Sequence, residues 1–175
     1  MSELEKVFAK PDLLLRSEHS LCPGCGEPVA LRVILELIAE LGVRERTICV
    51  AGIGCYTAFP SVIDVDVMQA LHGRAPSVAT GVKRVRPDAV VFTLQGDGDM
   101  ISEGLQEVLH TAASVNLTKE YLRAAFRSQL DGKGFSLVEI LTMCPTDWFV
   151  PPDQGPAFLE RHLVPTYPLG VIKDA

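Results

Sequence analysis

Hydrophobic residues follow two patterns along the chain, one typical of amphipathic helices and one typical of buried strands. Apolar residues recur at helical spacing over residues 27–41, and Gly42 then ends the pattern. Residues 89–94 form a continuous apolar run of the kind found in strands buried on both faces of a parallel sheet. The same patterns predict further strands at residues 47–50, 62–67 and 135–141, and further helices at residues 73–85, 101–113, 118–130 and 157–162.

The alternation of strands and helices predicts an α/β fold with a doubly wound, mostly parallel sheet. We expect residues 1–175 to form a single domain, with an amino-terminal arm at residues 1–20 and a carboxyl-terminal segment at residues 145–175 that wraps over the surface. In such sheets, ligands bind beyond the carboxyl ends of the strands. Three segments with reactive side chains fall at predicted strand ends, namely the turn that ends in Cys55, the loop at Asp97, and Cys144.

The composition is that of an ordinary globular protein. A chain of 175 residues and 19.0 kDa, with 47% hydrophobic and 22% charged residues, is long enough for one domain with a hydrophobic core. No apolar run approaches the ~20 residues that span a bilayer, and the amino terminus lacks the apolar stretch of a secretory signal. The net charge of −6 argues against nucleic-acid binding, because phosphate-binding domains are usually basic. We therefore expect a cytoplasmic protein whose partners are neither membranes nor nucleic acids.

The cysteines indicate metal or redox chemistry, because the cytoplasm keeps thiols reduced and disfavours disulfides. Cys22 and Cys25 form a CxxC unit, which alone fits half of a zinc site, a redox pair or part of an iron–sulfur site. Cys55 and Cys144 each follow a predicted strand, where their sulfurs can reach a shared site. Cys49 lies within an apolar strand and is interpreted as buried packing. Four thiolates from three loops suit a [4Fe–4S] cluster, with a structural zinc ion as the alternative.

The loop of Gly96, Asp97, Gly98 and Asp99 lies between a predicted strand and a predicted helix. The two glycines let the backbone approach phosphate oxygens, and the helix amino terminus favours an anion. Asp97 can supply the hard oxygen ligand that Mg²⁺ prefers. The sequence thus suggests a site for a metal-bound diphosphate, although a simple polar turn has the same pattern.

Seven motifs together resemble a known protein family. In chain order they are CPGCGEP (22–28), GIGC (52–55), VDVMQALHGRAPSVATGVKRVRPD (65–88), QGDGD (95–99), GKGFSLVEIL (132–141), MCPTDW (143–148) and VPTYPLG (164–170). This set resembles the β subunits of 2-oxoacid:ferredoxin oxidoreductases over nearly the whole chain. The resemblance implies a thiamine-diphosphate-binding domain of the pyrophosphate type.

The resemblance also implies three cofactors and the residues that hold them. It assigns the four ligands of one [4Fe–4S] cluster to Cys22, Cys25, Cys55 and Cys144. It assigns the Mg²⁺ of thiamine diphosphate to Asp97, within a cofactor loop formed by Gly96, Asp97, Gly98 and Asp99. The residues expected against the thiamine are Ile53, Gly54, Cys55, His72 and Gly73, with His72 as a possible catalytic residue.

By the same resemblance, the expected activity is the coenzyme A-dependent oxidative decarboxylation of a 2-oxoacid, with electrons passed through the cluster to ferredoxin. The CPGCGEP and CPTDW motifs favour 2-oxoglutarate or a branched-chain 2-oxoacid over pyruvate. In this family the glutamate that activates thiamine comes from the α subunit, so we expect this chain to be active only with that partner.

The chain departs from the family in its centre. Relatives carry a further strand after the GDG loop, which ends in an asparagine that completes the Mg²⁺ site. Here a segment is missing between about Ala113 and Thr118, and Asn116, the only asparagine, is not expected to replace the absent ligand. The alternative hypothesis is therefore a non-catalytic subunit, stabilised by a metal or relaying electrons, that has lost thiamine chemistry.

Overall fold

The structure is a computed structural model and describes residues 9–16, 18–104, 119–134 and 136–167. Its centre is a parallel sheet formed by β1 (Thr47–Ala51), β2 (Asp66–Gln69) and β3 (Val90–Leu94). The strands lie in the order β2-β1-β3, with Ile48 opposite Asp66 on one side and Val91 on the other. The central strand β1 is almost entirely buried, as its apolar sequence predicts.

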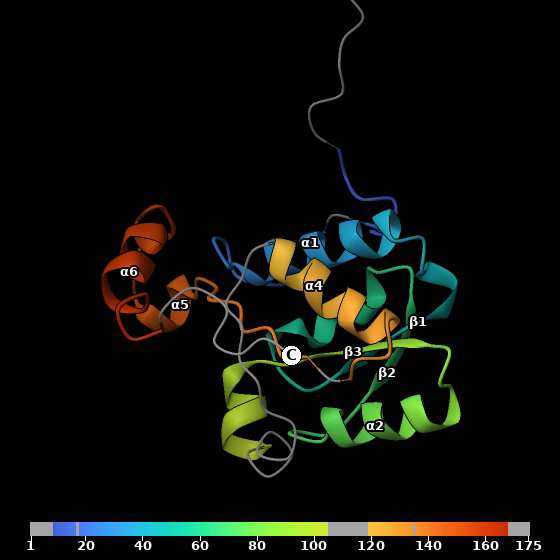
Figure 1. Ribbon diagram of the computed structural model, residues 1–175. Coiled ribbons are helices and arrows are strands. Elements are labelled where there is room, and N and C mark those ends of the chain that lie inside the picture. Colours follow the sequence, from blue (N-terminus) through green and yellow to red (C-terminus); the bar gives the residue numbers. More distant parts are fainter. Residues whose placement is uncertain (1–8, 17, 105–118, 135, 168–175) are drawn as a thin grey trace, which may run out of the picture.

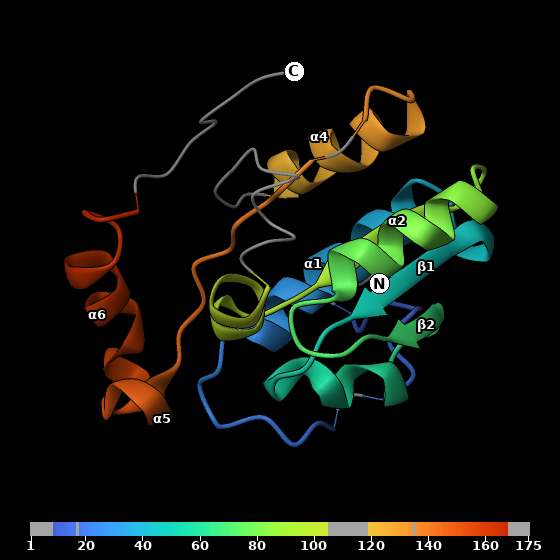
Figure 2. The same ribbon diagram turned by 90° about the horizontal axis from the view of Figure 1, so that it is seen from below.

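Helices cover both faces of the sheet, which confirms the doubly wound α/β fold. Helices α1 (Glu27–Glu40) and α4 (Lys119–Leu130) lie on one face, and α2 (Ala75–Val85) lies on the other (Figure 1). The view from below places α2 in front of α1, with the sheet between them (Figure 2). The shorter helices are η1 (Arg44–Arg46), η2 (Cys55–Ser61), η3 (Gly98–Glu103), α5 (Pro145–Trp148), η4 (Pro152–Gln154) and α6 (Gly155–His162).

The main core lies between the sheet and the α1–α4 layer. Helix α1 contributes an apolar stripe at helical spacing, and Phe59 of η2 and Phe126 of α4 pack into the same cluster. The residues of α1 in this cluster are Leu31, Ile34, Leu35, Leu37 and Ile38. A smaller cluster under α2 is built from Val50, Ala70, Ala75, Ala89 and Val91. The small residues in this second cluster let α2 lie close to the sheet.

The amino-terminal arm is tied to the fold over the residues that the structure describes. Leu13 is buried, and its carbonyl accepts a hydrogen bond of 2.8 Å from the Asp64 N–H. Leu15 N–H donates to the Val62 carbonyl at 2.8 Å, and Leu14 forms an antiparallel bridge with Ile63. These contacts explain why the strand predicted at residues 62–67 starts late. Its first residues pair with the arm, and parallel pairing with β1 begins only at Asp66.

The strand predicted at residues 135–141 is wrong for the residues described there. Only Glu139 has a bridge assignment in that segment. The outer edge of β3 is partly occupied, because the Gln129 side chain bonds the N–H and the carbonyl of Val91 at 2.6 and 2.7 Å. A further strand would need those same two backbone groups.

Two helices differ in their boundaries from the prediction. Helix α2 starts at Ala75 rather than Gly73, because Gly73 has a left-handed φ of +68°. The helix predicted at residues 101–113 starts as the π-helix η3, and its residues from 105 onward lie outside the described part. Thr118, the first residue of the helix predicted at residues 118–130, and the expected central gap also lie outside the described residues.

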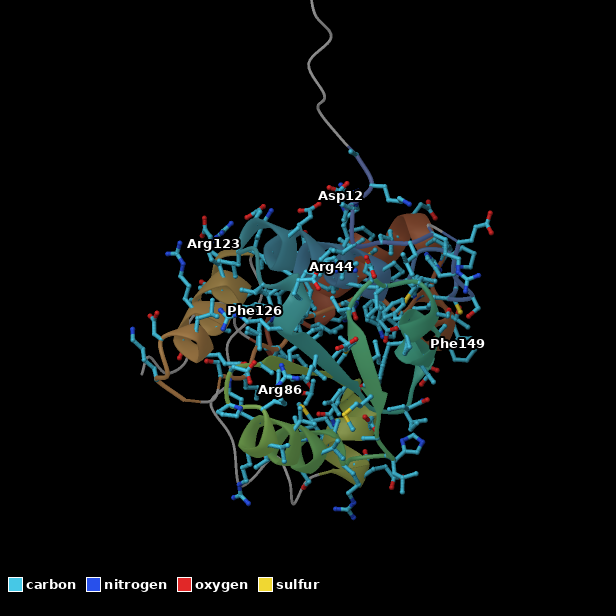
Figure 3. The ribbon with its side chains drawn as sticks, turned by 90° about the vertical axis from the view of Figure 1, so that its right-hand side faces the viewer. Asp12, Arg44, Arg86, Arg123, Phe126 and Phe149 are labelled. Carbon is cyan, nitrogen blue, oxygen red and sulfur yellow. The ribbon has the colours of Figure 1, made fainter. Side chains whose placement is uncertain are left out.

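The carboxyl-terminal segment forms two short helices set beside the sheet (Figure 1). Trp148 stacks on Phe158 with ring centroids 5.0 Å apart, and Phe158 contacts His162 at 4.5 Å. Phe149, with φ of 54°, is 94% exposed at the periphery of the molecule (Figure 3). Within the described residues, no helix is both long and apolar enough to cross a membrane.

Candidate functional site

The loops that follow the three strands meet at one edge of the sheet. Residues 52–55 follow β1, His72 and Gly73 lie beyond β2, and residues 95–99 follow β3. Because the strands are parallel, their carboxyl ends share this edge, which is the usual ligand site of doubly wound sheets. Two of the three segments that the sequence predicts at strand ends thus meet here as loops that follow strands, together with the His72 loop. The third segment, at Cys144, follows no strand in the described residues but approaches the same edge, as the cysteine contacts below show.

A single carboxylate, Asp99, joins these loops. One oxygen, Oδ1, accepts hydrogen bonds from the Gly73 N–H at 2.9 Å and lies 3.0 Å from His72 Nδ1. The other oxygen, Oδ2, accepts hydrogen bonds from the Tyr56 hydroxyl at 2.7 Å and from Gln95 Nε2 at 3.4 Å. The Asp99 side chain is 1% exposed. Asp99 is therefore a buried connection between the loops after β1, β2 and β3.

Close backbone approaches fix Asp99 in this position. A Cβ atom on Gly52 would lie 1.9 Å from Asp99 Oδ2, so only glycine fits beside the carboxylate. A Cβ atom on Gly73 would lie 2.5 Å from the carbonyl carbon of Glu103, at the end of η3. The loops after β1 and β2 therefore both need glycine to contact the segment that carries Asp99.

The electrostatics of this cluster favour an ionised Asp99. Burial by itself would raise the pKa of Asp99, but the hydrogen bonds from Tyr56, Gly73, Gln95 and His72 lower the pKa below its ordinary value. Burial raises the pKa of the Tyr56 hydroxyl, and the adjacent charge of Asp99 raises it further. Tyr56 therefore remains a hydrogen-bond donor to a charged carboxylate, which is a strong interaction in a buried place.

The other aspartate of the loop, Asp97, faces solvent. Asp97 and Gly98 are exposed, and a Cβ atom on Gly98 would meet no atom within 4 Å. Asp97 also interacts electrostatically with Glu27, the first residue of α1. Burial raises the pKa of Glu27, and the negative charge of Asp97 raises this pKa further. Asp97 is thus available to a ligand, whereas the oxygens of Asp99 are used within the protein.

Two buried oxygen atoms near this loop have no hydrogen-bond partner among the described residues, Glu27 Oε2 and Gln95 Oε1. Both atoms are acceptors, and an unpaired buried acceptor is costly. A cation or a ligand with hydrogen-bond donors would satisfy them. The exposed Asp97, the open space at Gly98 and these two oxygens together fit a metal-bound diphosphate.

The cysteines gather near the same edge from three segments. Cys22 and Cys25 form a turn closed by a 3.0 Å hydrogen bond from the Cys25 N–H to the Cys22 carbonyl. The next residue, Gly26, donates its N–H to the Met143 carbonyl at 3.0 Å, which joins the turn to the segment of Cys144. Cys22 and Cys55 are exposed, and Cys25 and Cys144 are half-buried.

The four thiols lie within electrostatic range of one another. Burial raises the pKa of the Cys25 thiol, and negative charge on Glu27, Cys144 and Cys55 raises it further. Burial likewise raises the pKa of Cys55, with added contributions from Glu27, Cys144 and Cys22. In the part of the chain that the structure describes, no three His, Cys, Asp or Glu side chains lie close enough to hold a metal ion. The thiols therefore converge on one region without forming a closed coordination site.

Cys49 is confirmed as buried packing. It is 2% exposed within β1, and burial raises its pKa to about 12. Two residues of the site were not predicted from the sequence, Tyr56 and the Gln95 side chain. Tyr56 directly follows Cys55, and Gln95 directly precedes the glycine–aspartate loop, so adjacency to predicted site residues was the available signal.

Comparison with known proteins defines the class of the domain. Residues 52–118 match the family described as thiamine pyrophosphate enzyme, C-terminal TPP binding domain. This region contains Cys55, His72, Asp97 and Asp99, and so includes all three loops that the Asp99 cluster connects. The matched part, 67 of the 175 residues, is therefore similar to a thiamine pyrophosphate-binding domain at the edge where the fold has its ligand site.

Two individual relatives indicate a more specific class of protein. The chain is 37% identical to ketoisovalerate oxidoreductase subunit VorA of Methanothermobacter thermautotrophicus, over 62% of this chain and 25% of the relative. It is 39% identical to 2-oxoglutarate oxidoreductase subunit KorB of Mycobacterium tuberculosis, over 61% of this chain and 29% of the relative. The predicted resemblance to 2-oxoacid:ferredoxin oxidoreductase β subunits is thereby confirmed, although the matched regions span less than a third of these relatives.

A longer alignment shows that this chain is shorter than one relative within the matched region. VorA of Methanothermobacter marburgensis is 24% identical over 252 aligned positions, which cover 97% of this chain and 53% of the relative. Since 97% of this chain is about 170 residues, about 80 aligned positions of the relative have no counterpart here. This finding agrees with the prediction that a segment is missing.

A solved structure shows the same fold. The 2-oxoglutarate:ferredoxin oxidoreductase from Magnetococcus marinus, with 2-oxoglutarate, coenzyme A and succinyl-CoA bound, superposes with a TM-score of 0.68. The two proteins are 23% identical, and the superposition covers 82% of this chain and 70% of that one. At this identity the likeness establishes the fold.

Proposed function

We propose that this chain is the β subunit of a 2-oxoacid:ferredoxin oxidoreductase and holds thiamine diphosphate at the carboxyl ends of its strands. The observation that carries the proposal is that the match to a thiamine pyrophosphate-binding domain, residues 52–118, contains every loop that Asp99 joins at that edge. The ligand site of the fold and the matched region therefore coincide.

The residues available at this edge suit a diphosphate with its metal. Asp97 is the proposed Mg²⁺ ligand, because it is exposed and Mg²⁺ prefers carboxylate and phosphate oxygens. Gly96 and Gly98 let the backbone approach the diphosphate. The residues proposed to lie against the thiamine are Ile53, Gly54, Cys55, His72 and Gly73. Thiamine diphosphate, when bound, supplies the electron sink that decarboxylation needs.

The proposed cluster ligands are Cys22, Cys25, Cys55 and Cys144. Their four sulfurs match the usual ligand set of a [4Fe–4S] cluster, and the Gly26–Met143 hydrogen bond holds two of their segments together. Because Cys55 directly follows the loop proposed for thiamine, electrons would have a short path from the reacting centre to the cluster.

The proposed reaction consumes a 2-oxoacid, coenzyme A and two oxidised ferredoxins. The bond between the carboxylate carbon and the oxo carbon breaks, a thioester bond to coenzyme A forms, and the products are an acyl-CoA, CO₂, a proton and two reduced ferredoxins. 2-Oxoglutarate is the favoured substrate, since a KorB relative and the solved neighbour carry that name. An α subunit completes the enzyme, and residues 1–175 act as one domain of this heteromer, which we place in the cytoplasm, where free thiols persist.

The test is substrate-dependent electron transfer by the native complex, purified without oxygen through a tag on this chain. We expect the complex to reduce ferredoxin only when both a 2-oxoacid and coenzyme A are present, and fastest with 2-oxoglutarate. The same preparation from cells that carry Asp97→Asn should lose this activity. Ferredoxin reduction that is equal with and without the 2-oxoacid would contradict the proposal.

One observation favours a second candidate, a subunit that relays electrons without thiamine chemistry. About 80 positions of a relative have no counterpart in this chain, and the family places a Mg²⁺ ligand after the GDG loop. The two candidates differ in the cofactors that they contain. The enzyme subunit co-purifies with thiamine diphosphate, whereas the relay subunit contains iron and sulfide without thiamine.

A further inference from the structure

We propose that Asp99 is a positioning residue that fixes His72 in one tautomer, with the proton on Nδ1 and with Nε2 presented as an acceptor at the ligand edge. A different assignment of Asp99, as a residue that contacts the cofactor, would need an acceptor site on the carboxylate that is free. Each oxygen already has two polar contacts inside the protein, Gly73 N–H and His72 Nδ1 at Oδ1 and Tyr56 and Gln95 at Oδ2, which together use the roughly four acceptor sites of a carboxylate.

The tautomer follows from the donors around Asp99. Oδ1 accepts from the Gly73 N–H, and Oδ2 accepts from the amide Nε2 of Gln95, and neither of these groups can act as an acceptor. With donors on both oxygens, the carboxylate has no need for a proton of its own. His72 Nδ1, at 3.0 Å from Oδ1, must therefore be the donor in that contact.

The geometry also sets the direction of the other ring nitrogen. Asp99 is buried at 1% exposure, whereas the His72 side chain is 53% exposed, so the ring spans from the interior to the surface of the site. With Nδ1 directed at Asp99, Nε2 lies on the exposed side and carries the lone pair. This is the arrangement in which a buried carboxylate orients a histidine that accepts a proton or a hydrogen bond.

Asp99, in the first turn of η3, is held by contacts from two other segments. Tyr56 donates to Oδ2 at 2.7 Å from the far side, and Gly52 leaves no room for any larger residue beside the same oxygen. Tyr56 and His72 come from loops after different strands, so the carboxylate cannot shift toward one without losing the other. The ring orientation is therefore determined by residues outside its own loop.

The use of Nε2 toward a ligand rests on the proposed function, but the tautomer itself does not. The measurement is a ¹⁵N correlation spectrum of the histidine side chains in the full, ligand-free chain, with the His72 signals assigned through His72→Gln. We expect wild-type His72 to show a protonated Nδ1 and an unprotonated Nε2 at a pH where the ring is neutral. An Nε2–H tautomer, or two tautomers in similar amounts, would overturn the proposal without requiring any variant.

Two matched variants distinguish the positioning of His72 by Asp99 from a general effect of removing one negative charge. Asp99→Asn keeps the shape but replaces one acceptor oxygen with an NH₂ group, so His72 should lose its single tautomer. Asp97→Asn removes the same charge two residues away without touching His72, and its His72 signals should match the wild type. Equal changes in both variants would overturn the proposal. Failure of the chain to bind thiamine diphosphate would leave these spectra unchanged and would count against the proposed function alone.

Discussion

The side-chain amide of Gln129 pairs with both backbone groups of Val91, accepting from its N–H at 2.6 Å and donating to its carbonyl at 2.7 Å. Gln129 belongs to α4 and Val91 to β3, so a side chain takes the place of a neighbouring strand at this point of the sheet edge. An unpaired edge invites association with other chains, and this contact blocks part of it.

Replacing Gln129 tests this contact. Gln129→Leu has a similar size but leaves two half-buried backbone groups without partners, so we expect the free energy of unfolding to fall by about 1–3 kcal/mol. Urea denaturation followed by circular dichroism measures the change. Arg127→Ala, on the exposed side of the same helix, is the control and should change stability by less than about 0.5 kcal/mol. Equal effects of the two substitutions would show that the Val91 contact contributes nothing specific.

The fit between Gly52 and Asp99 predicts a large cost for a single methyl group. In Gly52→Ala the new Cβ would lie 1.9 Å from Asp99 Oδ2, so the carboxylate or the loop must move. We expect a loss of about 1–3 kcal/mol of stability, seen as a lower melting temperature. The control is Gly81→Ala in α2, where a Cβ atom meets nothing within 4 Å and should stabilise the helix by up to ~1 kcal/mol. A Gly52→Ala variant as stable as the wild type would contradict the described packing.

The contact between α1 and α4 predicts a loss of stability in acid. Lys119 bonds both Glu36 and Glu40, and Arg123 bonds Glu40. Hydrogen bonds from Lys119 and Arg123 lower the pKa of Glu40; burial alone would raise the pKa of Glu36, but bonds from Arg32 and Lys119 lower it overall. Groups with a lowered folded pKa stabilise the fold above their ordinary pKa of 4.5, and this contribution is lost as the pH falls through the folded values.

We therefore expect Glu36→Gln with Glu40→Gln to destabilise the chain at about pH 7, by less than ~1 kcal/mol per exposed pair, and to have little effect at about pH 3. Urea midpoints at both pH values measure this difference. Glu160→Gln, an exposed residue of α6, should show no such pH dependence. A penalty that persists undiminished in acid would mean that the glutamates act through packing rather than charge.

The proposed assignment of four cysteines as cluster ligands predicts which thiols are needed to bind iron. After anaerobic reconstitution with iron and sulfide, we expect the wild-type chain to hold about four of each. Cys55→Ala should lose most of the iron, whereas Cys49→Ala should keep it, because Cys49 is buried within β1. Elemental analysis together with the visible absorption spectrum measures both. Zinc in place of iron, or equal iron in the two variants, would rule out this ligand set.

The sequence predicted the elements whose patterns depend on local spacing. The apolar stripe of α1 and the buried run of β3 each identify their element without knowledge of the fold. The segment at residues 135–141 looks equally strand-like, but Gln129 occupies part of the outer edge of β3, through a contact across 38 residues that no local pattern reveals.

Contacts between residues far apart in the sequence also limit what could be predicted about the site. Asp97 and Asp99 are equivalent in the sequence pattern, yet residues two apart on a helical turn point in nearly opposite directions. One therefore faces solvent and the other the interior. Which of them is buried depends on Tyr56 and Gly52, more than 40 residues away. The type of site and the choice of Asp97 as the candidate metal ligand were thus predicted from the sequence, but the buried position of Asp99 and its contacts were not.

The central claim, that this chain holds thiamine diphosphate through Asp97, is tested most directly by cofactor content. Thiamine diphosphate is measured per chain in the native complex, purified without oxygen from cells that carry either the wild-type chain or Asp97→Asn. We predict about one thiamine diphosphate per wild-type chain and at least about tenfold less in the variant at limiting Mg²⁺. A wild-type complex without thiamine diphosphate, or equal content in the Asp97→Asn complex, would contradict the claim.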